Sequence, residues 1–496
     1  MLHEPETAGS PSRLLTTLDN APFTRRHCML YGTVLAGHFL DGFVINTTGV
    51  VLPAVIPAFH LSTKQAGYLS SVLFLGMLVG AAVAGVVSDR LGRKFPLAAC
   101  LLVFAGFSLL AALSWDYPSL MAARFLQGIG LGAEIAVVLP YITEFVPSRL
   151  RAPLVTMATG AWLIGLPVAG VVGAAVVPSL GWRAMFVIGV APVLVSAAVA
   201  LALPESVRYL LRKRRDADAR SVVLALTRGA ETAGPVAPHA PPQREAPADG
   251  GSGAAGSVRL LLSGRYLRFT VSLWLMELCA GAFLYGLSTW LPSVLEKKGI
   301  GLLGSLTYTA VITAAGVLGA LIAGYTVKRV GRRITIGVSF LLSGAFCLWW
   351  GSAGTTVSVV VLGCFATFFG SGFAGSTLFV YASELYPTFN RATGLGWAAA
   401  WQKVGGLVIP TVIGWVLALH SSSYLFFVLF AVISALAGAS GLLATFETNK
   451  KTIEQITDLM TAGTRRAQDG PAETAPAPRV AHATELTAPY DRETGR

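Results

Sequence analysis

Residues 85–94 read Gly-Val-Val-Ser-Asp-Arg-Leu-Gly-Arg-Lys, and residues 324–333 read Gly-Tyr-Thr-Val-Lys-Arg-Val-Gly-Arg-Arg. A second pair is 141–149 (Tyr-Ile-Thr-Glu-Phe-Val-Pro-Ser-Arg) and 381–391 (Tyr-Ala-Ser-Glu-Leu-Tyr-Pro-Thr-Phe-Asn-Arg). Both pairs keep nearly the same offset, close to half of the chain, and both halves are hydrophobic. Self-similarity at a fixed period determines the architecture of a protein. Here it predicts a membrane transporter made of two like bundles with a substrate path between them.

The composition also indicates a membrane protein. Of the 496 residues, 54% are hydrophobic and 12% are charged, about half the charged share of a soluble domain. Apolar stretches of about 20 residues recur, each long enough for a helix to cross a hydrocarbon core of roughly 30 Å. We therefore expect an all-α polytopic membrane protein, with 12 transmembrane helices in two pseudo-symmetric six-helix bundles. The expected spans are 28–52, 66–88, 95–114, 119–141, 154–177, 184–203, 268–291, 305–327, 334–352, 356–381, 393–418 and 423–445.

The net charge of +12 is unevenly distributed, because basic side chains gather in alternate inter-helix segments. Cytoplasmic loops are enriched in Lys and Arg, so this asymmetry sets orientation and places both termini in the cytoplasm. It favours topology signals over a nucleic-acid site, and we expect no nucleic-acid partner. The first 20 or so residues lack the apolar core and cleavage site of a signal peptide, so the first helix should itself direct the chain to the cytoplasmic membrane.

The predicted organisation has five parts. They are a cytoplasmic N-terminal tail (1–27), an N-terminal bundle (28–203), a cytoplasmic linker (204–267), a C-terminal bundle (268–446) and a cytoplasmic C-terminal tail (447–496). Within the linker, residues 231–257 are mostly Ala, Pro and Gly. Such a stretch is too poor in apolar bulk to pack, which predicts disorder there and over most of the C-terminal tail.

Several kinds of chemistry have no support in the sequence. The five cysteines show no metal-ligand spacing, so we expect free thiols and no metal. There is no phosphate-binding G-x-x-x-x-G-K-[ST] motif, which argues against direct ATP drive. No Ser-His-Asp constellation emerges either. We therefore expect neither an enzyme nor a cofactor.

Residues 85–94 resemble the G-x-x-x-D-R-x-G-R-K motif of the major facilitator superfamily. Its glycines allow a tight turn between helices, and its basic residues hold the loop at the cytoplasmic face. The resemblance implies that Asp89 meets a helix N-terminus across the interface of its half, where a carboxylate complements the helix dipole. This contact would lock the outward-open state and release as the protein turns inward. Lys328 replaces the aspartate in the second copy, so we expect the C-terminal half to lack a carboxylate latch.

Other matches extend the resemblance over most of the chain. Residues 124–134 look like the R-x-x-x-G-x-G-x-G element of the fourth helix, and 204–210 look like a loop element near helix 6 of sugar and organic-anion porters. With 396–406, they are closest to the proton-coupled metabolite and aromatic-acid symporters, including niacin-permease-like proteins. A third repeated pair is 204–206 (Pro-Glu-Ser) and 446–448 (Phe-Glu-Thr). The gating candidates from these motifs are Gly85, Asp89, Arg90, Gly92, Arg93, Glu144, Arg149, Glu205, Arg208, Glu384 and Arg391.

Ionisable side chains at mid-membrane depth cost about 3 kcal/mol each to insert, so they are functional candidates by default. Asp41 is the first choice for the proton carrier, because desolvation favours the protonated form of a buried carboxyl group. Residues 41–43 (Asp-Gly-Phe) resemble the D-G-[FY]-D start of aromatic-acid symporters, but Val44 stands where the second acid belongs. The alternative is that Asp41 is permanently paired, with His38 one turn earlier as its partner. The proton-coupling candidates are Asp41, Glu134 and Glu277.

A carboxylated substrate in an apolar cavity needs a fixed cation, since its own desolvation would otherwise exclude it. Lys403 is a candidate clamp, although lysine lacks the planar fork of arginine. It could instead form a salt bridge with Glu277 or Glu134. Arg124 is the second candidate, or a structural tie near the outer face of its helix. Aromatic rings could hold a ring-bearing substrate or could pack helices. The substrate-contact candidates are Lys403, Arg124, His38, Trp162, Tyr285, Trp397, Trp401 and Gln402.

The sequence therefore predicts a secondary active transporter that imports a small organic acid, an aromatic or other monocarboxylate, together with a proton. Two bundles would rock about a central site in a protein that acts as a monomer in the lipid bilayer. One alternative is a proton-coupled efflux antiporter for a drug or secondary metabolite, because direction is set by gradients and coupling. Another is a nutrient sensor without transport, but the Ala- and Pro-rich linker and tail give no sign of a signalling domain.

Overall fold

The computed structural model describes residues 11–227, 258–259, 261–264, 266–386, 390–419 and 423–449, and in these ranges it is helical. Twelve helical stretches are long and apolar enough to cross a membrane, as the sequence predicts. The elements are α1 (Pro11–Asp19), α2 (Arg25–Ala58), α3 (Thr63–Leu91), α4 (Lys94–Ala112), α5 (Tyr117–Phe145), η1 (Ser148–Leu150), α6 (Arg151–Leu180), α7 (Trp182–Ile188), α8 (Pro192–Ala202), α9 (Val207–Arg212), α10 (Asp216–Thr227), α12 (Leu267–Lys297), α13 (Leu302–Val330), α14 (Arg332–Gly351), α15 (Thr356–Thr367), η2 (Phe368–Gly375), α16 (Ser376–Leu385), α17 (Arg391–Leu419) and α18 (Tyr424–Ala444).

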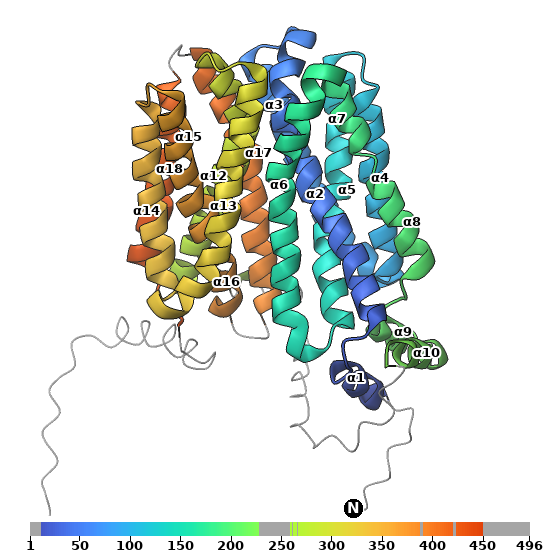
Figure 1. The fold of residues 1–496 in the computed structure, drawn as a ribbon. Coiled ribbons are helices and arrows are strands. Elements are labelled where there is room, and N and C mark those ends of the chain that lie inside the picture. Colours follow the sequence, from blue (N-terminus) through green and yellow to red (C-terminus); the bar gives the residue numbers. More distant parts are fainter. Residues whose placement is uncertain are drawn as a thin grey trace, which may run out of the picture.

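Helices α2–α8 and α12–α18 form two side-by-side bundles (Figure 1). Within the first bundle, α5 packs on α3 and α4 through the glycines of the 124–134 motif. A Cβ atom on Gly128 or Gly132 would meet the backbone of α3, and one on Gly130 would meet α4. Small residues let membrane helices approach at the backbone, so this motif is a packing device for three helices.

The two bundles contact each other from their middle to one end. At that end a Cβ atom on Gly67 of α3 would meet the backbone of α17 at Pro410, and the hydroxyl groups of Ser71 and Thr411 lie 2.8 Å apart. We call the other end, which carries Arg93, Arg151 and Arg332, the basic end. Trp415 near the contacting end of α17 also donates a hydrogen bond to the Tyr68 hydroxyl of α3.

Toward the basic end the same helices separate. Four glycines lie in the basic-end portions of the four helices α3, α6, α13 and α17, and a Cβ atom on any of them would meet nothing within 4 Å. Trp397 of α17 is 41% exposed in this region. The contacts between the bundles lie toward the other end, for example between Gly170 of α6 and Ala310 of α13, so the structure is open toward the basic end. The four glycines are Gly85, Gly160, Gly324 and Gly396.

The N-terminal tail and the start of the linker are more ordered than the sequence analysis predicts. Helix α1 buries Leu14 and Leu18 against α9 and α10, and all three lie beyond the basic end of the first bundle (Figure 1). Asp19 pairs with Arg151, and the Thr24 hydroxyl donates to the Leu226 carbonyl. The predicted disorder of 231–257 and of the tail beyond 449 lies outside the described residues.

Candidate functional site

Three ionisable side chains meet inside the first bundle. Asp41 and Glu134 are fully buried, and His38 is 5% exposed. The His38 Nδ1 lies 3.2 Å from Glu134 Oε2, whereas Asp41 Oδ2 accepts a 2.8 Å hydrogen bond from the Trp162 indole. One donor atom from each acid and from His38 lies within 4.8 Å of the others. His38 therefore pairs with Glu134, not with Asp41 as the alternative above supposes.

The acid missing at Val44 has a structural replacement. Glu134 comes from α5 and brings a second carboxylate beside Asp41, so the pair is assembled by packing and not by sequence proximity. Asp41 Oδ1 and Glu134 Oε1 have no hydrogen-bond partner in the described part of the chain. Buried oxygens without a partner are costly unless they take up a proton or a cation. The three donor types also suit a metal ion, but a proton satisfies the same oxygens.

Two glycines bring Trp162 to Asp41. A Cβ atom on Gly42 of α2 would overlap the Trp162 carbonyl, and one on Gly165 of α6 would overlap the α2 backbone at Phe39 and Phe43. The two helix backbones are therefore in direct contact at this level. Trp162 is a candidate from the sequence, but its contact with Asp41 is a finding of the structure.

Lys403 reaches the same level from the second bundle. Its Nζ donates a 2.5 Å hydrogen bond to the Tyr285 hydroxyl and lies 5.7 Å from the ring centre of Trp162. No carboxylate oxygen lies within 4.0 Å of it among the described residues, so the alternative of a salt bridge to Glu277 or Glu134 is not formed. Lys403 is thus a cation held by two aromatic rings at the junction of the bundles.

The neighbouring face of α12 carries a second carboxyl group. Glu277 is 5% exposed and accepts a 3.4 Å hydrogen bond from Gln402 of α17. A Cβ atom on Gly281 would overlap the Gln402 carbonyl, which explains how α12 and α17 approach so closely. Glu277, Gly281 and Tyr285 of α12 therefore face Gln402 and Lys403 of α17.

An aromatic group, which the sequence analysis finds only in part, lies farther along α12 and α17. Trp274 of α12 lies 5.7 Å, centre to centre, from both Trp397 and Trp401. Trp397 and Trp401 are candidates from the sequence, but Trp274 is not. Its position seven residues before Gly281, on the same helical face, is the signal that could have found it.

Arg124 is separate from this junction. It is fully buried and bonds the Gln127 side chain and the Thr48 hydroxyl, with its guanidinium 5.5 Å from the Phe186 ring. Ten residues of helical rise put it about 15 Å from Glu134. These contacts join α2, α5 and α7, and they favour the structural tie over the substrate clamp.

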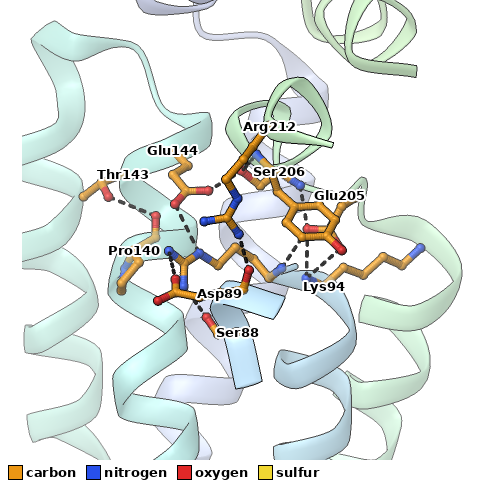
Figure 2. Close-up of polar contacts among 11 residues, drawn as sticks. Ser88, Asp89, Lys94, Pro140, Thr143, Glu144, Glu205, Ser206 and Arg212 are labelled. Atoms are coloured by element: carbon orange, nitrogen blue, oxygen red, sulfur yellow. Dashed lines mark hydrogen bonds and ion pairs between the residues drawn. The ribbon is translucent and has the colours of Figure 1, made fainter. Parts of the chain in front are cut away.

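At the basic end of the first bundle, polar and charged side chains join the start of α4 to the ends of α3 and α5 and to the loop after α8 (Figure 2). Arg93 Nε lies 3.2 Å from Glu144, and Arg93 also bonds Ser88. Glu205 accepts the backbone N–H groups of Arg93 (2.7 Å) and Lys94 (3.3 Å). A carboxylate therefore does meet a helix N-terminus here, but it is Glu205 and not Asp89.

The second bundle repeats this network. Arg332 makes two hydrogen bonds to Glu384, of 3.1 and 2.8 Å, and Glu447 accepts the backbone N–H groups of Arg332 (2.8 Å) and Arg333 (3.1 Å). The Thr448 hydroxyl donates to Glu384. Glu384 and Glu447 therefore correspond to Glu144 and Glu205 of the first bundle, and neither takes the position of Asp89, where the second copy has Lys328.

The other gating candidates lie at the edge of these networks or outside them. Asp89 is exposed and its carboxylate lies 3.7 Å from the Arg93 guanidinium, and among the described residues it makes no contact with the second bundle. The Arg391 Nε donates to the Tyr386 carbonyl. Gly85 lies inside α3, and the turn is made by Gly92 at φ 91°. Exposed at this end are Arg90, Arg149 and Arg208.

Two helical bundles with ionisable groups buried at their junction are the architecture of a secondary transporter. The Major Facilitator Superfamily matches residues 34–410, and the chain belongs to this family. The niacin transporter NiaP of Acinetobacter baylyi is 29% identical over 89% of this chain and 99% of its own length. The 4-hydroxybenzoate transporter PcaK of Pseudomonas aeruginosa is 31% identical, covering 75% of this chain and 82% of its own. The chain is a multi-pass membrane transporter and not an enzyme.

The fold is also found among solved structures. The inward-open xylose transporter XylE from E. coli has a TM-score of 0.68 at 17% identity and covers 87% of this chain and 99% of its own.

Proposed function

We propose that the protein is a symporter of the cytoplasmic membrane that carries one small aromatic monocarboxylate together with a proton. The observation that carries this proposal is the junction itself, where Lys403, held by two aromatic rings, lies near the buried acids Asp41 and Glu134. A cation between rings suits a ring-bearing anion. Two relatives named as transporters of niacin and of 4-hydroxybenzoate support the same substrate class.

Alternating access supplies the mechanism. The bundles contact at one end and separate at the basic end. The positive-inside rule puts the basic end in the cytoplasm, so the structure corresponds to the inward-facing state. Asp89 pairs with Arg93 of its own bundle and makes no described contact with the second bundle, which agrees with a gate that is released in that state. The networks around Arg93 and Arg332 would hold each bundle rigid while the two rock about the junction.

Uptake by purified protein in liposomes tests the proposal. Radiolabelled nicotinate, 4-hydroxybenzoate and xylose are offered separately with an inward proton gradient imposed. We expect accumulation of at least one of the two acids above its equilibrium level, and loss of that accumulation when an ionophore collapses the gradient. Xylose as the sole substrate would overturn the anion clamp. Accumulation driven only by an outward proton gradient would indicate an antiporter instead.

A further inference from the structure

Trp162 is the side chain that touches both the acid and the cation of the junction. Its indole N–H donates to Asp41, and its ring lies 5.7 Å from Lys403 Nζ. It also meets the Tyr285 ring edge-on, with centres 6.3 Å apart. One residue of the first bundle therefore joins a buried carboxyl group to a cation of the second.

The contact of Trp162 with Asp41 lies within one bundle, whereas its contact with Lys403 joins the two bundles. Asp41 and Trp162 belong to the same bundle, and the overlap that any Cβ atom on Gly42 would make with Trp162 shows that their helices are packed backbone to backbone. This contact stays intact when the bundles move as rigid bodies. Lys403 and Tyr285 belong to the other bundle, so their contact with Trp162 changes with that motion.

We propose that Trp162 is the positioning residue that couples protonation of Asp41 to capture of the substrate carboxylate by Lys403. The inference rests on the proposed symport. With Asp41 ionised, its carboxylate binds the indole N–H in a charge-assisted hydrogen bond, and the polarised ring holds the ammonium group. A proton on Asp41 removes the negative charge, so both contacts weaken and Lys403 is left for the anion.

A symporter requires that binding of the proton strengthens binding of the substrate, and the proposed coupling acts in this direction. The proton raises the affinity for the anion, and by linkage the anion raises the affinity for the proton by the same factor. An antiporter requires the opposite sign. Protonation here therefore prepares the site for a substrate and does not expel one.

Other charged or titratable groups also face Asp41 and influence its protonation. His38 comes from its own helix, Glu134 from α5 and Lys403 from α17, and all three act on it electrostatically. Cys100 of α4 lies near the same acids. From α12, Glu277 and Tyr285 lie beside Lys403. Trp162 → Phe leaves all of these groups in place, while it removes the indole N–H and makes the ring that faces Lys403 smaller.

The test is the pH dependence of binding by the full-length purified protein. The probe is radiolabelled nicotinate or 4-hydroxybenzoate, whichever the wild-type protein accumulates. Between about pH 8 and about pH 6 we expect wild-type binding to tighten about tenfold, and binding by W162F to tighten less than about threefold. The probe carboxylate stays ionised over this range, so its own titration does not contribute. At the acid end W162F should bind as tightly as wild type, because Asp41 is then protonated in both.

The matched control is Trp350 → Phe, which removes a buried indole N–H that has no partner among the described residues. It should keep the wild-type pH dependence. If W162F fails to fold, Trp162 → Leu also lacks a donor for Asp41 and should give the same result. Adding W162F to Asp41 → Asn should change nothing further, since the proton-binding group is already gone.

Three outcomes would overturn the inference. They are full pH dependence in W162F, equal weakening at both pH values as an ordinary packing or substrate contact would give, and additive effects in the double variant. Wild-type protein that accumulates neither acid would instead remove the proposed function, and the inference with it.

Discussion

Asp41 is the residue on which proton coupling depends most directly. Asp41 → Asn keeps the shape of the side chain and an acceptor for Trp162, but it cannot exchange a proton. We expect accumulation driven by a pH gradient to fall to the level of empty liposomes, while exchange of external for internal substrate persists because the loaded carrier still reorients. Uptake and counterflow in the same liposomes measure the two.

Glu296 → Gln is the control for that variant, because Glu296 lies at the end of α12 and away from the junction. It should accumulate substrate as the wild type does. Full accumulation by D41N with an intact pH dependence would remove Asp41 from the mechanism and leave Glu134 as the remaining acid of the cluster.

What the sequence can predict at this scale depends on whether a partner lies on the same helix. Asp41 is found from its motif and from its cost in a membrane. Its partner is not, because sequence spacing brings forward His38, a same-helix neighbour. Trp162 becomes the partner only through the close approach of α2 and α6 at Gly42 and Gly165, which spacing along either helix cannot show.

At the scale of elements, the turn between α3 and α4 is the sharpest target. Gly92 has φ 91° and ψ −168°, a region essentially restricted to glycine, and a Cβ atom there would overlap the Glu205 carboxylate. Gly92 → Ala should therefore destabilise the protein by about 1–3 kcal/mol, seen as a lower Tm in detergent. Gly331 has φ 98°, and a Cβ atom there would overlap the Glu447 carboxylate, so Gly331 → Ala should lower the Tm in the same way.

Gly106 → Ala provides the contrast, because Gly106 lies inside α4 with nothing within 4 Å of its Cβ position. Alanine in a helix interior is favoured over glycine by roughly 0.5–1 kcal/mol, so the Tm of G106A should be unchanged or higher than that of the wild type. A wild-type Tm for both G92A and G331A would show that the paired turns do not constrain the bundles.

The short helices of the tail and linker are elements that sequence patterns alone do not predict. Leu14 and Leu18 lie four positions apart, one helical turn, and are the signal for α1. With only nine residues, α1 cannot be told from a polar tail on periodicity alone. Its order comes from α9, α10 and the Asp19–Arg151 pair, which are tertiary contacts.

At the scale of the whole molecule, the repeats predict the two bundles, and the glycines and carboxylates that recur in register form matching charged networks at the basic ends of the structure. The junction does not repeat. Asp41 and Glu134 come from one bundle, and Lys403 comes from the other. The parts that must move alike are therefore symmetric. The junction, where a proton and an anion must meet, is asymmetric, with an acid in one bundle and a cation in the other.

The contact at the end opposite the basic loops should be a gate. Ser71 of α3 and Thr411 of α17 lie within hydrogen-bond distance across the two bundles, at 2.8 Å, so cysteines at both positions can approach disulfide geometry. In Ser71 → Cys with Thr411 → Cys, oxidation should fix the structure open toward the basic end and stop transport, and a reductant should restore it. Each single variant should transport under both conditions. Unimpaired transport by the fully cross-linked protein would show that this end need not open, and rocking about the junction would then be the wrong mechanism.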